Sequence, residues 1–351
     1  MDDKNDKGGK SSLSSNQNPQ QLKWMSLIYF VLQNVFLAIG IRVCHEFSDP
    51  FHPYISSTAV LCTETTKLFL SIAICFVHDA EADIWKFRDI AMKAFLDEGA
   101  DLLKLLVPAL LYCIQNNLQY VIESAPLFLV MYQLKVITTA IFYSSLLQRR
   151  INNKEWLTII ILAIGVGMVQ SSQKEFLPHH ASNVIGMFAV AFACVTSGMA
   201  GVFFEKTIKQ SKSTIWMINV QMSLLSCVLS MIITMVSSTD TIIDLGFFSG
   251  FNPYVVAVVF LQAITGLVIA MVVKYSDNIH KGFATSISIV LSGFLESLLF
   301  RNSFDINLSF AIGSALVGAS SVLFIYITNQ RHWSSSATGE IVQQPTSALD
   351  L

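Results

Sequence analysis

A lysine lies in the interior of a long apolar stretch, at residues 126–147, where a charge is costly. On a helix, Phe128, Tyr132, Lys135 and Thr139 share one face, because they are spaced by four, three and four residues. A charged side chain inside a membrane-spanning helix costs about 3 kcal/mol on insertion scales, so Lys135 is a functional candidate. A lysine with a tyrosine one turn away is suited to hold a phosphate; a structural ion pair is the alternative.

Two further lysines lie in or at the head of apolar stretches. Glu64 and Lys67 are one helical turn apart, so they either neutralise each other or leave Lys67 facing a central cavity. Another lysine heads a stripe of hydroxyl side chains with the same four, three, four spacing: Lys281, Thr285, Ser288 and Ser292. This stripe indicates either a packing seam between helices or one wall of a polar pathway.

Side-chain amides also interrupt the apolar stretches. Asn116 and Asn117 follow Gln115, and Asn219 and Gln221 stand together further along the chain. Unpaired amides are costly in hydrocarbon, so they either join helices to one another or read the edges of a bound base and sugar. Asn219 and Gln221 point about 200° apart on a helix, so they need not share a face.

The composition requires membrane helices to position these side chains. Hydrophobic residues make up 53% and charged residues 13% of the 351, with a mean hydropathy of +0.57, whereas soluble domains carry about 25% charged residues. We predict an all-α membrane protein with ten transmembrane helices, and a charged segment at 78–103 that forms an amphipathic surface helix. The ten spans run over 24–41, 54–77, 104–122, 126–147, 157–171, 183–204, 214–237, 253–275, 281–299 and 306–328.

The basic residues predict the orientation of these spans. Of 22 Lys and Arg residues, 17 lie on the side that holds both tails, three lie on the other side and two lie inside spans. This asymmetry predicts cytosolic termini. We expect a disordered cytosolic tail over 1–23, a transporter domain over 24–330 and a second disordered tail over 331–351. Hydropathy suggests a 5+5 inverted repeat with halves of about 24–171 and 183–328.

Other functional classes lack support in the sequence. The net charge of -2 gives no sign of nucleic-acid binding, and the six cysteines form no CxxC or zinc-like spacing. We therefore expect no metal, no cofactor and no disulfide framework. A membrane transferase would require acidic or histidine clusters, but the pair His179-His180 has no carboxylate array nearby beyond Glu175, so we do not expect an enzyme.

Several motifs, in order along the chain, resemble the nucleotide-sugar transporters of the drug/metabolite transporter superfamily. The resemblance covers residues 24–328 and lies in the branch for CMP-sialic acid, UDP-galactose and UDP-N-acetylglucosamine. The motifs are Tyr112-Cys-Ile-Gln-Asn-Asn-Leu-Gln-Tyr120, Met131-Tyr-Gln-Leu-Lys135 followed by Thr138-Thr139-Ala140, Gly198-Met-Ala-Gly-Val-Phe-Phe-Glu-Lys206, and Lys274-Tyr-Ser-Asp-Asn-Ile-His-Lys-Gly-Phe-Ala-Thr285.

The resemblance implies a ten-helix antiporter of the Golgi, or alternatively of the endoplasmic reticulum. Such a protein brings a nucleotide sugar into the lumen and returns the nucleoside monophosphate. Its further partner is the lipid bilayer, and both a monomer and a homo-oligomer are compatible with the resemblance. The ligand contacts that it implies are Lys67, Asn116, Asn117, Tyr132, Lys135, Asn219, Gln221 and Lys281.

Three positions depart from the family pattern and bear on the substrate. Phe128-Leu129 replaces a Tyr-or-Phe-Gln pair, Phe203 replaces a tyrosine, and His280 replaces a leucine. The run from Gln115 to Val121 resembles the UDP-sugar members more than the CMP-sialic acid ones. We therefore favour UDP-galactose or UDP-N-acetylglucosamine. CMP-sialic acid, or a non-transporting scaffold that retains the fold, is the alternative.

Overall fold

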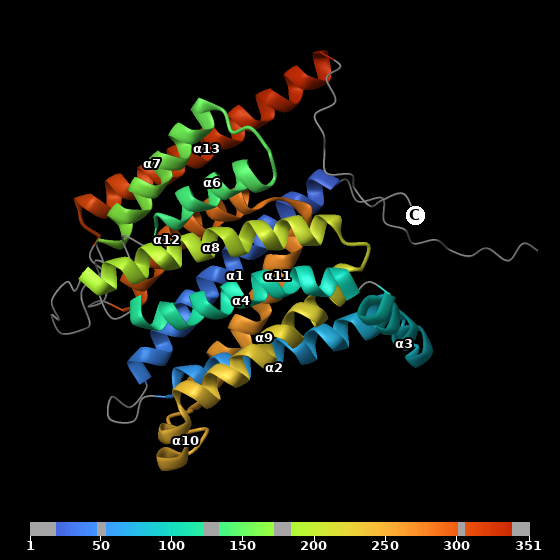
Figure 1. The fold of residues 1–351 in the computed structure, drawn as a ribbon. Helices are drawn as coiled ribbons and strands as arrows, with labels where there is room; N and C mark the ends of the chain where they lie inside the picture. The colour runs from blue at the N-terminus through green and yellow to red at the C-terminus, as the bar shows by residue number, and fades with distance from the viewer. Residues whose placement is uncertain are drawn as a thin grey trace, which may run out of the picture.

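The computed structural model describes residues 19–47, 54–97, 99–122, 133–171, 184–300 and 306–338, and every regular element within these ranges is a helix (Figure 1). The all-α fold predicted from the sequence is therefore confirmed for this part of the chain. The helices are α1 (Pro19–Phe47), α2 (Ser56–Ile74), η1 (Cys75–Asp79), α3 (Ile84–Met92), η2 (Lys93–Asp97), α4 (Gly99–Ile122), α6 (Lys135–Leu146), α7 (Asn153–Gln170), α8 (Val184–Gln210), α9 (Ile215–Ser237), α10 (Thr239–Leu245), α11 (Pro253–Tyr275), α12 (Asn278–Leu299) and α13 (Leu308–Thr338).

Seven of the described helices are long and apolar enough to cross a membrane: α1, α2 continued by η1, α8, α9, α11, α12 and α13. The chain is therefore a multi-pass membrane protein. Helices α4, α6 and α7 lie where the other three spans were predicted. Helix α6 covers only the second half of the stretch 126–147, whose first half lies outside the described residues.

Local sequence signals account for several helix starts. Asn252 accepts a hydrogen bond from the backbone of Val255 at 2.8 Å, and Pro253 occupies the first turn of α11, where its missing N–H has no consequence. The hydroxyl of Thr214 caps α9 in the same way, accepting from the backbone N–H of Met217. Helix α1 begins at Pro19, earlier than the span predicted from 24, because a helix can continue past the hydrocarbon into water.

The helices form a row of packed pairs (Figure 1). Helices α7 and α13 pack together at one end of the row, and α2 and α9 pack together at the other. Between them, α1 packs on α11 and α12, while α4 and α6 pack on α8. Helices α1 and α8 thus run through the middle of the bundle, where a central site would be surrounded by protein.

The bundle is apolar on its outside and buries polar side chains among apolar ones. Large apolar side chains such as Phe69, Phe188 and Val322 are exposed, and this surface suits the lipid hydrocarbon. The buried set, in contrast, includes many hydroxyl, amide and carboxyl side chains, among them Gln221 and Glu205 at 1% exposure. Because hydrocarbon offers no hydrogen bonds, these groups must find their partners inside the bundle.

The segment predicted as an amphipathic surface helix is helical, as α3 and η2. Phe87 and Ile90 pack against a buried cluster that includes Cys75, Ala94 and Met217. The side-chain amide of Gln221 in α9 donates to the carbonyl of Ala94 at 2.8 Å. This segment is therefore fastened to α9 rather than attached only through its two connections.

Glycines allow α7 and α13 to come into backbone contact. A Cβ atom at Gly313 would lie 2.7 Å from the carbonyl oxygen of Gly165, and one at Gly165 would lie 3.0 Å from the carbonyl oxygen of Gly313. Small residues at facing positions permit this approach, which gains van der Waals contact between helices in a membrane.

We expect Gly313→Ala to destabilise the protein by about 1–3 kcal/mol, because the new methyl group meets backbone that cannot move aside without separating the helices. The loss would appear as a lower Tm of the purified protein in detergent. Gly318→Ala is the matched control on the same helix, since nothing lies within 4 Å of a Cβ atom there. Equal melting of the two variants would contradict this account.

Candidate functional site

The bundle has two sides that the chain itself distinguishes. We call the side that carries the start of α1, the end of α8 and the α11–α12 connection the tail side. The far side carries the end of α1 at Phe47 and the start of α2 at Ser56 (Figure 1).

A cavity of about 380 Å³ lies between α1, α2, α4, α8, α9 and α11. It reaches the far side at His45, which is exposed at the end of α1. Its deepest lining residues towards the tail side include Phe204 and Asn219, both buried, and Phe204 packs edge-to-face with Tyr112 at 6.5 Å. Among the described residues, the cavity lining thus extends from the exposed end of α1 to packed side chains towards the tail side.

Lys67 and Glu64 both line this cavity and form an ion pair one turn apart on α2. The stem of Lys67 runs along α11 at Gly266, where a Cβ atom would lie 2.7 Å from its Cδ atom. Gly266 therefore provides the space in which the lysine lies. The two alternatives predicted for Lys67, pairing with Glu64 and facing a cavity, are therefore both true of its position.

Amide and hydroxyl groups supply the rest of the polar lining. The hydroxyl of Thr63 donates to Gln262 at 3.2 Å, and the hydroxyl of Thr265 receives a bond from Gln33 at 3.3 Å. Asn219 donates to the carbonyl of Ile215 one turn earlier at 3.1 Å. A wall of this kind offers donors and acceptors at fixed positions to hydroxyl groups or to the edge of a base.

The other amides expected at the site are placed differently. Gln221 lies two residues beyond the wall position of Asn219, points to Ala94 and does not line the cavity. Gln115 does line it. Asn116 and Asn117 belong to α4, but their side chains lie outside the described residues, as does Tyr132 altogether.

Lys135 and Lys281 form a second lysine group, away from the cavity lining just described. They head α6 and α12, which touch, since a Cβ atom at Gly282 would lie 3.7 Å from the Cγ1 atom of Val136. The two ammonium groups are near enough to repel each other, and Glu205 is near enough to Lys281 to offset that repulsion.

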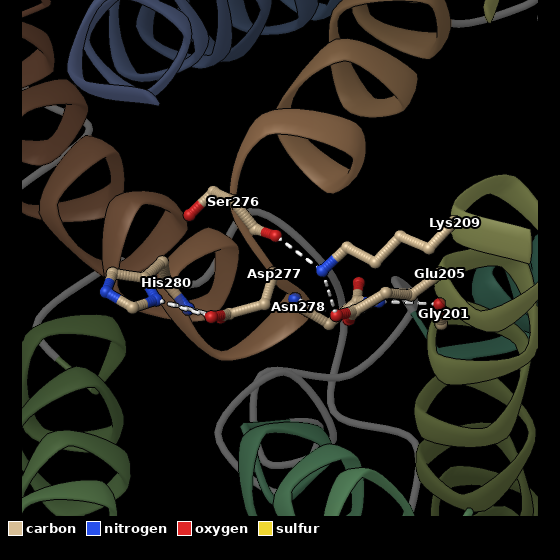
Figure 2. Close-up of polar contacts among 7 residues, drawn as sticks. All are labelled: Gly201, Glu205, Lys209, Ser276, Asp277, Asn278 and His280. Atoms are coloured by element: carbon tan, nitrogen blue, oxygen red, sulfur yellow. Dashed lines mark hydrogen bonds and ion pairs between the residues drawn. The ribbon is translucent and has the colours of Figure 1, made fainter. Parts of the chain in front are cut away.

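A buried polar network adjoins this second group (Figure 2). Glu205 on α8 is 1% exposed, and one of its oxygens accepts from both the backbone and the side-chain nitrogens of Asn278, each at 2.9 Å. Its other oxygen accepts from Lys209 at 2.7 Å, and Lys209 also donates to the carbonyl of Ser276 at 2.7 Å. Asn278 donates to the carbonyl of Gly201 at 2.6 Å. The network therefore fastens the α11–α12 connection to the tail-side half of α8.

His280 extends these contacts to α1 and α13. Its Nδ1 atom lies 2.9 Å from both oxygens of Asp277, its Nε2 atom lies 3.0 Å from the ammonium of Lys23, and its ring meets Phe324 edge-on at 5.3 Å. Burial raises the pKa of the Asp277 carboxyl, but the charge and hydrogen bonds of His280 and the charge of Lys209 outweigh it, so that this pKa lies below its ordinary value. The departure from leucine at 280 thus adds polar contacts on the tail side.

The hydroxyl stripe behind Lys281 is a packing seam. Thr285 donates to the carbonyl of Lys281 at 2.9 Å, Ser288 to that of Thr285 at 2.7 Å, and Ser292 to that of Ile289 at 3.1 Å. Ser288 and Ser292 are buried and are absent from the cavity lining. Because each hydroxyl is satisfied by its own helix, the stripe can pack closely without a ligand.

Reasoning from the sequence missed several of these residues. Gln262 is a lone amide in a very apolar helix, so the argument from insertion cost could have identified it. Glu205 appeared only as part of a motif, without a role. Its partner Asn278 is more than 70 residues away in the chain, and no local spacing connects the two.

The fold and the cavity define a multi-pass membrane protein with a polar, solute-sized chamber inside the bundle, and comparison with known proteins places it further. A family profile described as "Nucleotide-sugar transporter" matches residues 18–326. The chain belongs to this nucleotide-sugar transporter family, which consists of transporters and not of enzymes.

Individual relatives are similar over most of their length. The UDP-N-acetylglucosamine/UDP-N-acetylgalactosamine transporter nstp-4 of Caenorhabditis elegans is 37% identical, over 86% of this chain and 93% of that protein. The UDP-N-acetylglucosamine transporter of Rattus norvegicus is 36% identical over 87% and 95%. The UDP-galactose translocator of Canis lupus familiaris is 38% identical over 85% and 75%. A solved crystal structure that is 12% identical matches with a TM-score of 0.61 over 86% of this chain and 95% of that one, which shows the shared fold.

We expect Lys209→Met to lower the free energy of unfolding by about 3 kcal/mol, because it leaves the Glu205 carboxylate buried with one partner fewer. Adding Glu205→Gln should recover part of this loss, since the buried charge is then gone while the amide oxygen can still accept from Asn278. Thermal unfolding in detergent measures both effects.

The matched control is Lys86→Met, which breaks the exposed pair of Lys86 with Glu81, 2.9 Å apart, and should leave the Tm almost unchanged. If the Lys209 variant melts like the Lys86 variant, the buried network does not hold these helices together.

Proposed function

We propose that this protein is an antiporter that carries a pyrimidine nucleotide sugar from the cytosol into the Golgi lumen in exchange for the nucleoside monophosphate. The observation that carries the proposal is the polar cavity with Lys67 and Asn219 in its wall, in a chain of the nucleotide-sugar transporter family. Both ligands contain the same nucleotide, so one site can serve in both directions.

The names of the relatives favour a UDP-sugar as the substrate. Transporters for UDP-N-acetylglucosamine and for UDP-galactose match this chain at 36–38% identity. The two sugars differ at a single hydroxyl centre and in one acetamido group, and the lining amide and hydroxyl groups of Gln262 and Thr63 are of the type that reads such differences. We rank CMP-sialic acid behind both.

The lysines divide the recognition of the ligand between two places along the bundle. Lys67 contacts a phosphate of the ligand in the cavity, where Asn219 contacts the base or the sugar. Lys135 and Lys281 attract the remaining phosphate charge from nearer the tail side, together with Tyr132, Asn116 and Asn117. Gln221 contributes to the site indirectly, because its hydrogen bond to the carbonyl of Ala94 fixes the part of α9 that carries Asn219. Two neighbouring cations at the heads of α6 and α12 are suited to a diphosphate, whose charge they would share.

Ten spans arranged as two inverted halves, with both tails in the cytosol, complete the proposal. In a 5+5 repeat each helix of the first half corresponds to the helix five spans later, so that α1 corresponds to α8 and α4 to α11. Under this correspondence the packing of α1 on α11 is equivalent to the packing of α8 on α4. The same correspondence converts α1 on α12 into α8 on α6, and it maps α2 with α9, and α7 with α13, onto themselves. These paired contacts support the repeat, and the placement of basic residues supports the orientation.

Alternating access follows from this arrangement as a rocking of the two halves. The cavity lining extends to His45 on the far side, which is the lumen in this orientation, and the network around Glu205 joins α8 to the α11–α12 connection on the tail side. Opening to the cytosol then requires the contacts between α8 and the α11–α12 connection to separate.

Counterflow in proteoliposomes tests the function. Purified protein is loaded with internal UMP or CMP, and uptake of labelled UDP-N-acetylglucosamine, UDP-galactose and CMP-sialic acid is compared. We expect uptake of a UDP-sugar that depends on internal UMP. Uptake that depends on CMP would transfer the assignment to CMP-sialic acid, and no uptake by folded protein would favour the scaffold alternative.

Lys135→Ala should abolish this counterflow, because the phosphate loses a cation in a region where water cannot replace it. Lys212→Ala removes a charge from the exposed α8–α9 connection and should keep close to full activity. Counterflow by the Lys135 variant at the wild-type rate would remove this lysine from the site.

A further inference from the structure

The cavity contains both a cation and its internal anion. Among its described lining residues, Glu64 is the one carboxylate and Lys67 the one lysine, and the two are paired. Within the described lining, the charges of Glu64 and Lys67 therefore cancel. A ligand with a phosphate group enters a chamber whose lysine already has a partner.

The geometry keeps this pair in place. Both residues lie on α2, three positions apart, so no movement of one helix against another separates them. Glu64 is 8% exposed, and the stem of Lys67 is held along Gly266 of α11. Beside them in the described lining stands the uncharged Thr63, whose hydroxyl donates to Gln262.

An anion that binds to Lys67 must therefore compete with Glu64. We propose that Glu64 is the internal counter-ion of the empty transporter: it neutralises Lys67 until the ligand phosphate displaces it, and so sets both nucleotide affinity and the tightness of exchange. This inference rests on the proposed function and adds to it a residue that opposes ligand binding. No proton is transferred and no covalent bond is formed or broken, because the salt bridge of Lys67 to Glu64 is replaced by one to the phosphate.

The counter-ion has a consequence for the transport cycle. Moving an unpaired charge through the low-dielectric interior is unfavourable, whereas a neutral pair can pass with much less resistance. Glu64 therefore lets the empty transporter reorient and return without a ligand. Net uptake without internal nucleotide should accompany exchange in the wild type, and it should decrease when Lys67 has no internal partner.

The experiment compares wild type and Glu64→Gln in the same proteoliposomes. UMP affinity is measured by calorimetry on purified protein, and the ratio of UMP-loaded counterflow to net uptake into nucleotide-free vesicles is measured with labelled UDP-N-acetylglucosamine or UDP-galactose. We expect Glu64→Gln to bind UMP about tenfold more tightly, since a like charge beside the phosphate is removed, and to show a higher ratio of exchange to net uptake.

Two further variants separate a counter-ion from a merely structural residue. Glu46→Gln removes a carboxylate from the exposed end of α1, where Glu46 lies 4.0 Å from Arg42, and should leave UMP affinity and the ratio unchanged. In Glu64→Gln combined with Lys67→Gln, the cavity is again neutral when empty. UMP should then bind more weakly than in Glu64→Gln, and the ratio should return towards that of the wild type.

The outcomes distinguish this inference from the proposed function. If folded Glu64→Gln binds UMP no more tightly than the wild type, Glu64 is not a competitor and the inference is wrong, even though counterflow by the wild type persists. If the wild type neither binds UMP nor exchanges any nucleotide sugar, the proposed function and this inference both fail. Should Glu64→Gln not fold, Glu64→Asp, which keeps the charge but draws it back from Lys67, must still raise UMP affinity above that of the wild type.

Discussion

The absence of hydrogen-bonding partners in hydrocarbon is the constraint on which the rest of this structure depends. Every polar group that the bundle buries must be satisfied by another part of the same chain. Glu205 illustrates the result: its two oxygens accept three hydrogen bonds, from Asn278 twice and from Lys209 once. Lys209 in turn satisfies the carbonyl of Ser276, where the backbone turns between α11 and α12.

The same constraint explains why charges occur in groups inside the bundle. Lys67 has Glu64 on its own helix, and Lys281 has Glu205 within electrostatic reach. A buried ion pair contributes little net stability, because desolvation offsets the attraction between its members. In the transporter that we propose, the pair has a functional role, because Lys67 can pass from Glu64 to a ligand anion without being left unpaired.

Close helix packing determines where these groups meet. Helix α8 passes α6 at Gly198, where a Cβ atom would lie 2.8 Å from the backbone nitrogen of Thr139. It passes α12 at Gly201, where a Cβ atom would lie 3.0 Å from the side-chain oxygen of Asn278. Small residues on α8 therefore bring Glu205 into contact with the start of α12, and the cavity floor at Phe204 lies directly beside this contact.

The helical class, the seven long apolar helices and the position of Lys67 at a cavity were accessible from the sequence. Apolar length and the cost of burying a charge are local properties that each segment carries by itself. The resemblance placed both Asn219 and Gln221 at the site, but in the structure Asn219 lines the cavity and Gln221 donates to the backbone of η2.

The packing of the helices against one another could be read only from the folded protein, and this packing determines which side chains form pairs. Hydropathy cannot tell a hydroxyl stripe that lines a pathway from one bonded to its own helix, as Ser288 and Ser292 are. It also cannot pair Glu205 with Asn278, or place Gly266 under Lys67. The order of residues along the chain is enough to show that charges are buried in a membrane bundle. Their partners were decided by packing, because these partners come from helices that are distant in the chain and adjacent only after folding.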